Sequence, residues 1–526
     1  MKQTSIKPLV LALALLAALP AAFPVHAGER EQLEALRETT QAIIDALVEK
    51  GILTEEAAKA LVKQAEDKGQ VVAEAPGNAE LAVGVVRVPY IPEVVKREIR
   101  EQIRQEVVAQ AKTERWGDVN AVPEWVDRLK WEGDLRVRYQ GDLFAEDNDT
   151  GNSFLLDPYG LGSATLPINT SEDRTRFRVR ARLGLLAKVS ETVSGGFRLT
   201  TGTTSDPVST NQSLGNSFNK NSLVLDRAYG KAKPWDWLEM TAGRIPNPFF
   251  STDLVWDDDL NFDGVAATFK PWPNITMNAK PFFSLGAFPL QEVQSSTINL
   301  AKDKWLYAAQ AGLDWRSGAN SRWRFGLAYY DYRNIKAIQD PAPGDTFYDY
   351  TDSILSSRQK GNTVFEVAPT DKAGVYGLAS DYQLINLTAM ADLAHFDPVH
   401  VILSADVVKN VGYKAADVNS LLTTAQTAKT LGWQAKLTLG KPDVTLPGDW
   451  QFSLGYRYLQ RDAVLDAFTD SDFNLGGTNS KGYTLGATYG LDRNTWLTAK
   501  WLSANEIDGP LKFGVDVVQV DLNAKF

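Results

Sequence analysis

The sequence of 526 residues contains no cysteine and only three histidines, His26, His395 and His400. The lack of cysteine excludes disulfides, thiolate metal sites and a cysteine nucleophile. After residue 27 no run reaches 18 apolar residues, which excludes a protein that crosses a membrane with several helices. No G-x-S-x-G, H-E-x-x-H or Walker loop occurs. The sequence therefore predicts no catalytic residue, no metal site and no cofactor, and it does not indicate an enzyme.

Positive charge is also in short supply, since 55 Lys and Arg face 65 Asp and Glu for a net charge of -10. This balance argues against a nucleic-acid partner. Aromatic residues, in contrast, are plentiful, with 14 Trp, 17 Tyr and 22 Phe. So many aromatic side chains without a helical span call for another large apolar surface.

The first 27 residues predict a secretory signal peptide. A basic start with Lys2 and Lys7 precedes an apolar run over residues 9–23, and Val25 and Ala27 provide small residues at the cleavage positions. The run is too short for a comfortable membrane span. We expect the protein to leave the cytoplasm.

Residues 28–116 predict a helical prefix. Apolar positions recur every three or four residues over 29–50 and again over 93–115. Between them, Thr54 predicts a further helix start in a unit that Gly69 closes, and residues 70–92, with their prolines and glycine, predict a linker or extended segment. The stripes fit a small helical hairpin or a coiled coil that reaches into the periplasm, and a membrane-surface helix fits less well. Residues 117–128 are expected to form a linker.

From residue 129 onward the apolar pattern changes to a period of two, which is typical of strands. In the last segment, Val518, Val520, Leu522, Ala524 and Phe526 alternate with polar residues. The same alternation predicts sixteen strands, at 129–140, 175–187, 192–202, 223–233, 237–245, 259–270, 274–288, 304–316, 321–333, 380–393, 399–409, 430–440, 449–460, 480–490, 494–503 and 514–526.

The connections between these strands alternate between long and short, and this rhythm favours a membrane barrel over a soluble sandwich. Long extracellular loops and short periplasmic turns are typical of outer-membrane barrels. Lipid offers no partner to an unpaired strand edge, so the first and last strands must pair. We therefore expect an all-β, antiparallel transmembrane β-barrel of about 16 strands over 129–526, preceded by a short α-helical periplasmic segment.

Several segments resemble the bacterial outer-membrane porins and, more narrowly, the proteobacterial putative porin family. These are residues 88–96 (VPYIPEVVK), 123–126 (PEWV), 133–138 (GDLRVR), 242–249 (AGRIPNPF) and 261–264 (NFDG), together with the terminal Phe526. The resemblance implies an outer-membrane channel of no particular solute, and it implies that Phe526 serves recognition by the barrel-assembly machinery. It also implies contact with lipid and lipopolysaccharide, a homo-oligomer with a trimer favoured, and a third extracellular loop that folds into the pore.

Basic residues gather on the polar face of the first three predicted strands. Like charges at i and i+2 are tolerable inside a water-filled pore, where they would form a basic wall; the candidates are Arg136, Arg138, Arg176, Arg178, Arg180, Arg182 and Arg198. The third long connection, 246–258, and the residue after it supply the candidate acids Asp253, Asp257, Asp258 and Asp259. If that loop folds inward, acids and arginines would create a transverse field that favours polar solutes. Alternatively, the acids decorate a surface loop and the arginines pair with acids on adjacent strands.

The sequence thus favours a passive diffusion channel for small polar solutes or ions. From residue 129 on, 39 Lys and Arg face 45 Asp and Glu, so ion preference depends on the narrowest point and stays open. Two other functions stay open as well. The barrel could anchor a helical tether that contacts the cell wall, or it could be a specific uptake channel for an organic acid or an oxyanion.

Overall fold

The computed structural model describes residues 126–149, 169–272, 278–294, 302–339, 359–367, 376–509 and 512–526. The chain divides into two units, Met1–Val122 and Pro123–Phe526. The predicted signal peptide, helical prefix and most of the linker lie outside the described residues. Within the ranges that are described, no helix is long and apolar enough to cross a membrane.

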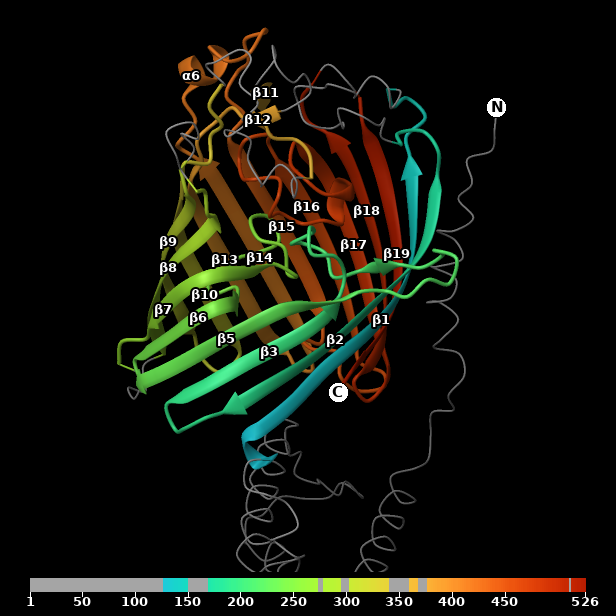
Figure 1. Ribbon diagram of the computed structural model, residues 1–526. Helices are drawn as coiled ribbons and strands as arrows, with labels where there is room; N and C mark the ends of the chain where they lie inside the picture. The colour runs from blue at the N-terminus through green and yellow to red at the C-terminus, as the bar shows by residue number, and fades with distance from the viewer. Residues whose placement is uncertain are drawn as a thin grey trace, which may run out of the picture. The chain divides into compact units, whose positions relative to one another are not determined.

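Sixteen antiparallel strands form a closed barrel, as predicted (Figure 1). They are β1 (Leu129–Phe144), β2 (Arg174–Lys188), β3 (Val193–Thr201), β5 (Leu223–Trp235), β6 (Leu238–Pro246), β7 (Asn261–Phe269), β8 (Ala279–Gln291), β9 (Lys304–Arg316), β10 (Ser321–Arg333), β13 (Gln383–Phe396), β14 (Val399–Asn410), β15 (Leu431–Gly440), β16 (Trp450–Leu459), β17 (Ser480–Asp492), β18 (Thr495–Glu506) and β19 (Gly514–Lys525). Each pairs with the next, and β1 pairs with β19. Every predicted strand has a counterpart, and the ends agree within four residues except at the start of β8, next to residues outside the described ranges.

Alternation along each strand separates a lipid face from a lumen face. On β10, for example, the side chains of Leu327 and Tyr329 are exposed, whereas Ala328 and Tyr330 are buried inside the barrel. An outward apolar face suits hydrocarbon, and ladder hydrogen bonds satisfy the backbone. The alternation of apolar and polar residues in the sequence therefore indicates which face of each strand contacts lipid.

The barrel closes where the C-terminus meets the start of β1. Gly133 and Phe526 exchange two backbone hydrogen bonds of 3.0 Å. The Phe526 ring lies over Gly133, so a Cβ added there would stand 2.3 Å from the ring. A larger side chain at this point of the seam would therefore require the Phe526 ring or the neighbouring strand β2 to shift.

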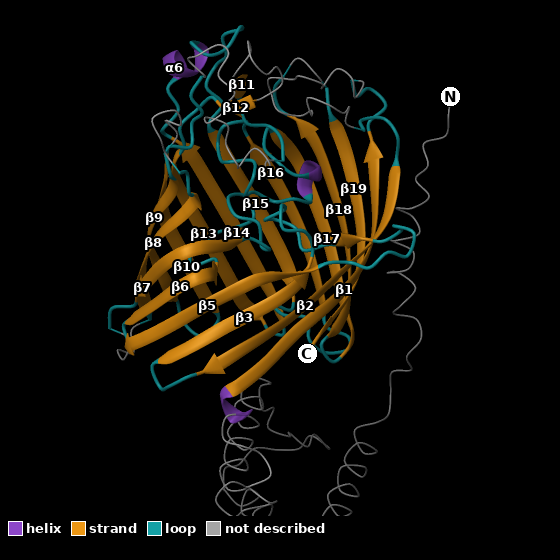
Figure 2. Cartoon of the chain, viewed as in Figure 1, coloured by secondary structure: helices purple, strands orange, loops and turns teal. Residues whose placement is uncertain are grey.

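Long loops and short turns occupy opposite ends of the barrel, as Figure 2 shows. The long-loop end carries α6 (Ala415–Asn419) and a small sheet of β11 (Val364–Glu366) and β12 (Tyr376–Leu378). The C-terminus and η3 (Val126–Arg128) lie at the short-turn end. Two further elements belong to long loops: β4 (Gln212–Ser213) pairs with β2, and η5 (Phe473–Leu475) packs against β18 and β19. In outer-membrane barrels the short turns face the periplasm.

Candidate functional site

The loop between β6 and β7, residues 247–260, folds into the barrel and is called here the constriction loop. At its start, the Phe250 backbone donates to Oε1 of Gln310 on β9 (2.8 Å) and accepts from Nε2 of the same side chain (2.7 Å). Farther along, the Thr252 hydroxyl donates to Asp406 on β14 (2.6 Å). Asp253 then reaches Arg457 on β16, seven strands around the ring from β7. The loop therefore crosses the lumen rather than lying along one wall.

Apolar packing holds the constriction loop inside. Leu254, Val255 and Trp256 are almost fully buried among lumen-facing wall residues. The Trp256 ring lies 4.9 Å from that of Phe262 on β7 and 5.2 Å from that of Tyr330 on β10, both edge to face. Burial of such a side chain contributes about 1.5–3 kcal/mol. Several of them together fix the loop independently of its charges.

The loop's last acid faces two of the predicted arginines. Oδ1 of Asp259 lies 3.1 Å from Nη1 of Arg182 and 3.7 Å from Nη1 of Arg180, both on β2. The two arginines also share Asp134 on β1, at 2.6 and 2.9 Å. Burial raises the pKa of Asp259, but the nearby guanidinium groups outweigh it and hold this pKa below its ordinary value. The result is a compact quartet of two cations and two anions.

On the opposite wall, Asp253 forms a second anchor. Its carboxylate lies 3.0 Å from Nη2 of Arg457 and accepts a 2.7 Å hydrogen bond from Gln434 on β15. Arg457 also pairs with Asp470 (3.0 Å), which belongs to the loop of residues 460–479. The pKa of Asp253 is lowered because Arg457 and the hydrogen bond from Gln434 outweigh burial.

The two remaining acids of the loop do not face the predicted arginines. Oδ2 of Asp257 accepts from the backbone N–H of Ser471 in loop 460–479 (3.0 Å), and Oδ1 accepts from that of Asp259 (2.7 Å). Burial, with Asp470 and Asp259 nearby, raises the pKa of Asp257 well above its ordinary value. Asp258 is exposed, and the cations that act on it are Lys500 on β18 and Lys436 on β15.

The other predicted arginines are each held by a neighbouring polar side chain. Arg138 is almost fully buried and pairs with Asp521 on β19 (2.7 Å) and with Asp472 of loop 460–479 (2.9 Å). The remaining contacts are Arg136 with Asn211, Arg176 with Asp142, Arg178 with Gln140 and Ser209, and Arg198 with Asp226. The face predicted as a basic wall is therefore a ladder of ion pairs and hydrogen bonds. Asp259 of the constriction loop approaches this face, and the strand acids Asp134 and Asp142 also pair with its arginines.

Sequence reasoning missed loop 460–479 and its partner Arg457. This loop packs on the constriction loop, and its residues Val464, Leu465 and Phe473 are buried. Such an apolar stretch in a predicted extracellular loop was the available signal that the loop folds inward.

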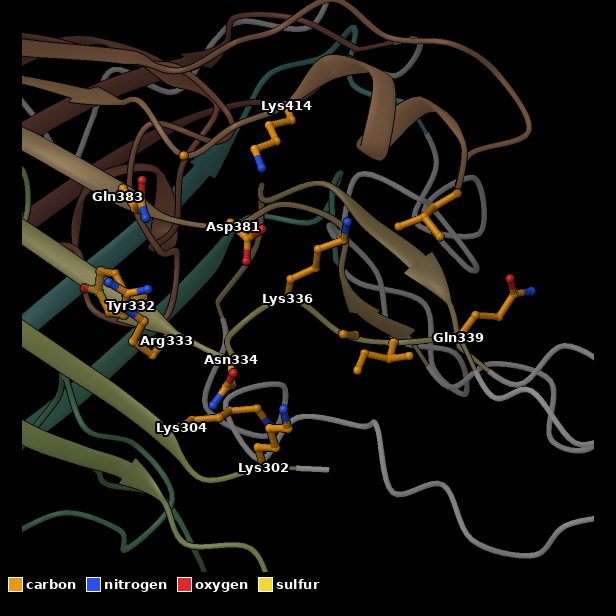
Figure 3. Close-up of a pocket in the computed structure, with 14 residues that line it drawn as sticks. Lys302, Lys304, Tyr332, Arg333, Asn334, Lys336, Gln339, Asp381, Gln383 and Lys414 are labelled. Carbon is orange, nitrogen blue, oxygen red and sulfur yellow. The ribbon is translucent and has the colours of Figure 1, made fainter. Parts of the chain in front are cut away.

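Two basic cavities open on the long-loop side. One, of about 530 Å³, is lined by Arg174, Arg176 and Arg178 with Asp142 and Asp206. The other, of about 620 Å³, lies at the rim, where lysines from separate loops surround one pocket (Figure 3); its cations are Lys302, Lys304, Arg333, Lys336 and Lys414. No carboxylate of the described residues lies within 4 Å of the amines of Lys302, Lys336 or Lys414. Cations outnumber carboxylates in the lining of both cavities, by five to one at the rim, where Asp381 is the carboxylate, and by three to two in the other.

The comparisons with known proteins agree with this architecture. Residues 37–526 match the family described as putative porin. The chain belongs to that family. It is accordingly an outer-membrane channel protein by family, a class of channels and not of enzymes. No curated protein matches the sequence.

Several solved structures are similar to this porin-family chain in fold. OprB of Pseudomonas putida at high pH is 13% identical with a TM-score of 0.45, over 78% of this chain and 97% of that one. The outer-membrane channel DcaP of Acinetobacter baumannii is 12% identical with a TM-score of 0.39, over 76% and 97%. OmpF of Salmonella typhi in complex with daunomycin is 11% identical with a TM-score of 0.39, also over 76% and 97%.

Proposed function

We propose that the barrel is a water-filled, passive diffusion channel for small polar solutes or ions, narrowed by the constriction loop. The observation that carries the proposal is the double anchoring of this loop. Asp259 meets Arg180 and Arg182 on one wall, and Asp253 meets Arg457 on the other. A loop tied to two walls of one lumen restricts the size of what passes without requiring a moving part.

The charges at the constriction suit polar solutes. Arginines of β1 and β2 lie on one side of the passage. The exposed Asp258 of the constriction loop interacts electrostatically with Lys500 and Lys436. Fixed charges of both signs along a narrow aqueous path order water and disfavour apolar solutes. No energy source is needed, since each solute follows its own gradient.

Single-channel recording of the purified full-length protein in a planar bilayer under a KCl gradient tests this function. Discrete current steps support an open pore, and the sign of the reversal potential gives its ion preference. A silent membrane, with the protein shown to be folded and inserted, would overturn the proposal and favour a plugged or tethering barrel. A variant that starts near Gly117 should still conduct if the barrel alone is the channel.

An anion-preferring uptake channel for organic acids or oxyanions is the second candidate. The two basic cavities on the long-loop side favour it, because anions entering from outside meet Arg174, Arg176 and Arg178 before the constriction. Competition of the ionic current by organic anions tests it. Block by these anions supports it, and an unchanged current refutes it.

We also propose a homo-oligomer, with a trimer favoured, assembled in lipid that includes lipopolysaccharide. The outward apolar side chains, such as Leu387, Leu454 and Phe452, support lipid or protein contact over the barrel's outer face. Native mass spectrometry from mild detergent distinguishes a trimer from a monomer.

A further inference from the structure

A third basic cavity lies on the short-turn side of the constriction loop, and it is called here the exit basin. Its volume is about 690 Å³. Asn247 and Pro248 of the constriction loop line it on one side, and Asp236 and Lys270 line it near the short turns. Most of its strand residues, such as Phe282 and Ser284 on β8, face the lumen. The exit basin therefore lies between the constriction loop and the short turns of the same lumen.

The exit basin has an excess of three positive charges. Six cations line it, against the three acids Asp236, Glu239 and Asp314; the cations are Lys231, Lys233, Lys270, Lys280, Arg322 and Arg324. Each acid is already paired with one cation: Glu239 with Lys231 (2.7 Å), Asp236 with Lys233 (3.1 Å) and Asp314 with Arg322 (2.9 Å). No carboxylate of the described residues lies within 4 Å of the charged groups of Lys270, Lys280 or Arg324. These three cations are available to a solute.

Arg324 is placed to bind an anion. Its guanidinium lies 4.2 Å from the ring centre of Phe250 on the constriction loop and 5.2 Å from that of Phe282 on β8. Its Nε is buried and has no hydrogen-bond partner. A guanidinium held by aromatic rings keeps its planar set of N–H donors, which matches a carboxylate or a phosphate. The rings orient the group without neutralising its charge.

We propose that the exit basin binds small organic anions, with the anionic group on Arg324, Lys270 and Lys280 and the apolar body on Phe282, Trp272 and Pro248. The proposal rests on the proposed channel function and deepens it by naming a solute class. A site just past the narrowest point raises flux when it binds strongly enough to fill and weakly enough to empty. The bound solute needs only one anionic group and an apolar body.

Isothermal titration of benzoate into the refolded full-length protein tests the site. Benzylammonium, with the same ring and the opposite charge, should not bind. Replacing Arg324 with Gln should weaken benzoate binding about five-fold. Two unit charges 4 Å apart in water attract by about 1 kcal/mol, and the loss of that attraction corresponds to this factor. Arg324→Lys should restore part of the lost benzoate affinity. The double variant Lys270→Gln/Lys280→Gln should lose more benzoate affinity than Lys270→Gln or Lys280→Gln alone.

A matched control removes one ion pair outside the exit basin without changing the net charge of the protein. The double variant Lys188→Gln/Glu191→Gln should bind benzoate as the wild type does, since this exposed pair (3.0 Å) does not line the exit basin. Equal affinity in the wild type, Arg324→Gln and Lys270→Gln/Lys280→Gln would overturn the proposal. So would equal binding of benzylammonium.

Current recording separates this proposal from the channel function. Benzoate added on the periplasmic side should block at lower concentration than benzoate added outside, and Arg324→Gln should remove this asymmetry. Binding that depends on Arg324 in a protein that never conducts would refute the channel and keep the site. If the protein conducts but substitutions of Arg324, Lys270 and Lys280 change neither benzoate binding nor benzoate block, the channel function stands and the binding site is refuted.

Discussion

Removing the negative charge of Asp259 should make the channel more selective for anions. Asp259 and Asp134 balance Arg180 and Arg182, so Asp259→Asn leaves one uncompensated positive charge at the constriction. A unit charge acts on an ion 4 Å away with about 1 kcal/mol in water and more at lower dielectric. We therefore expect the chloride-to-potassium permeability ratio to rise at least about five-fold. Asparagine keeps the shape of the side chain and can still accept the 2.9 Å hydrogen bond from Thr210.

The measurement is the reversal potential under a KCl gradient near 0.1 M, because at 1 M the screening length falls to about 3 Å and hides the effect. Arg182→Gln should shift the potential in the opposite direction, and Asp259→Asn/Arg182→Gln should return close to the wild type. Asp147→Asn is the control, since Asp147 is exposed in an extracellular loop beside Lys512. Shifts of the same sign in both single variants would refute the electrostatic reasoning.

Three further predictions follow from the seam and from the loop contacts. Arg138→Met leaves the buried Asp521 and the partly buried Asp472 without their cation, which should cost about 3–5 kcal/mol and lower the temperature at which the barrel unfolds on a gel; unchanged heat stability contradicts it. Gly133→Ala should also lower the unfolding temperature, because the added Cβ would stand 2.3 Å from Phe526 and 2.8 Å from the Arg182 carbonyl. Gly141→Ala on the same strand should leave this temperature unchanged, because a Cβ there meets nothing within 4 Å. Burial and the nearby carboxylates of Asp253 and Asp472 outweigh the effect of Arg457 and raise the pKa of Asp470 to about 6. Between about pH 6 and 4 the folded barrel therefore binds a proton at Asp470, whereas the unfolded chain does not. Stability should therefore rise as pH falls through 6, and anion preference should rise with it. Asp470→Asn should reduce both changes in a pH series of unfolding and reversal potential, while Asp257, whose pKa is also raised, accounts for what remains.

Local patterning was enough to predict the barrel. Alternation depends only on a residue and its neighbours, and lipid imposes it on every strand, so Leu327, Tyr329 and their counterparts mark the outer face without reference to the rest of the chain. The same holds for loop lengths, which alternate because the two ends of the barrel serve different compartments. These features were read from the sequence with nearly the observed bounds.

Partners within the lumen were beyond such reasoning. Asp253 meets Arg457 and Arg138 meets Asp472 only because loops far apart in sequence enter one enclosed space. Like charges along β2 predicted a basic wall, but the register of β1 against β2 places Asp134 beside Arg180 and Arg182 and so balances part of it. Ion pairs across strands depend on register and closure, which a single strand does not encode.

At the level of the constriction loop, the two halves of the lumen differ in chemistry. Lumen-facing Phe288, Tyr330 and Leu384 on β8, β10 and β13 are fully buried in one apolar cluster with residues of the constriction loop and of loop 460–479. An apolar wall is costly to expose to water, so the loops that cover it stay in place. We infer that, at this level, the aqueous path of the proposed channel runs on the other side, along the arginines of β1 and β2. Because apolar packing holds the constriction loop in addition to its ion pairs, substitutions at Asp259 and Arg182 should change the electrostatic field in the path without moving the loop.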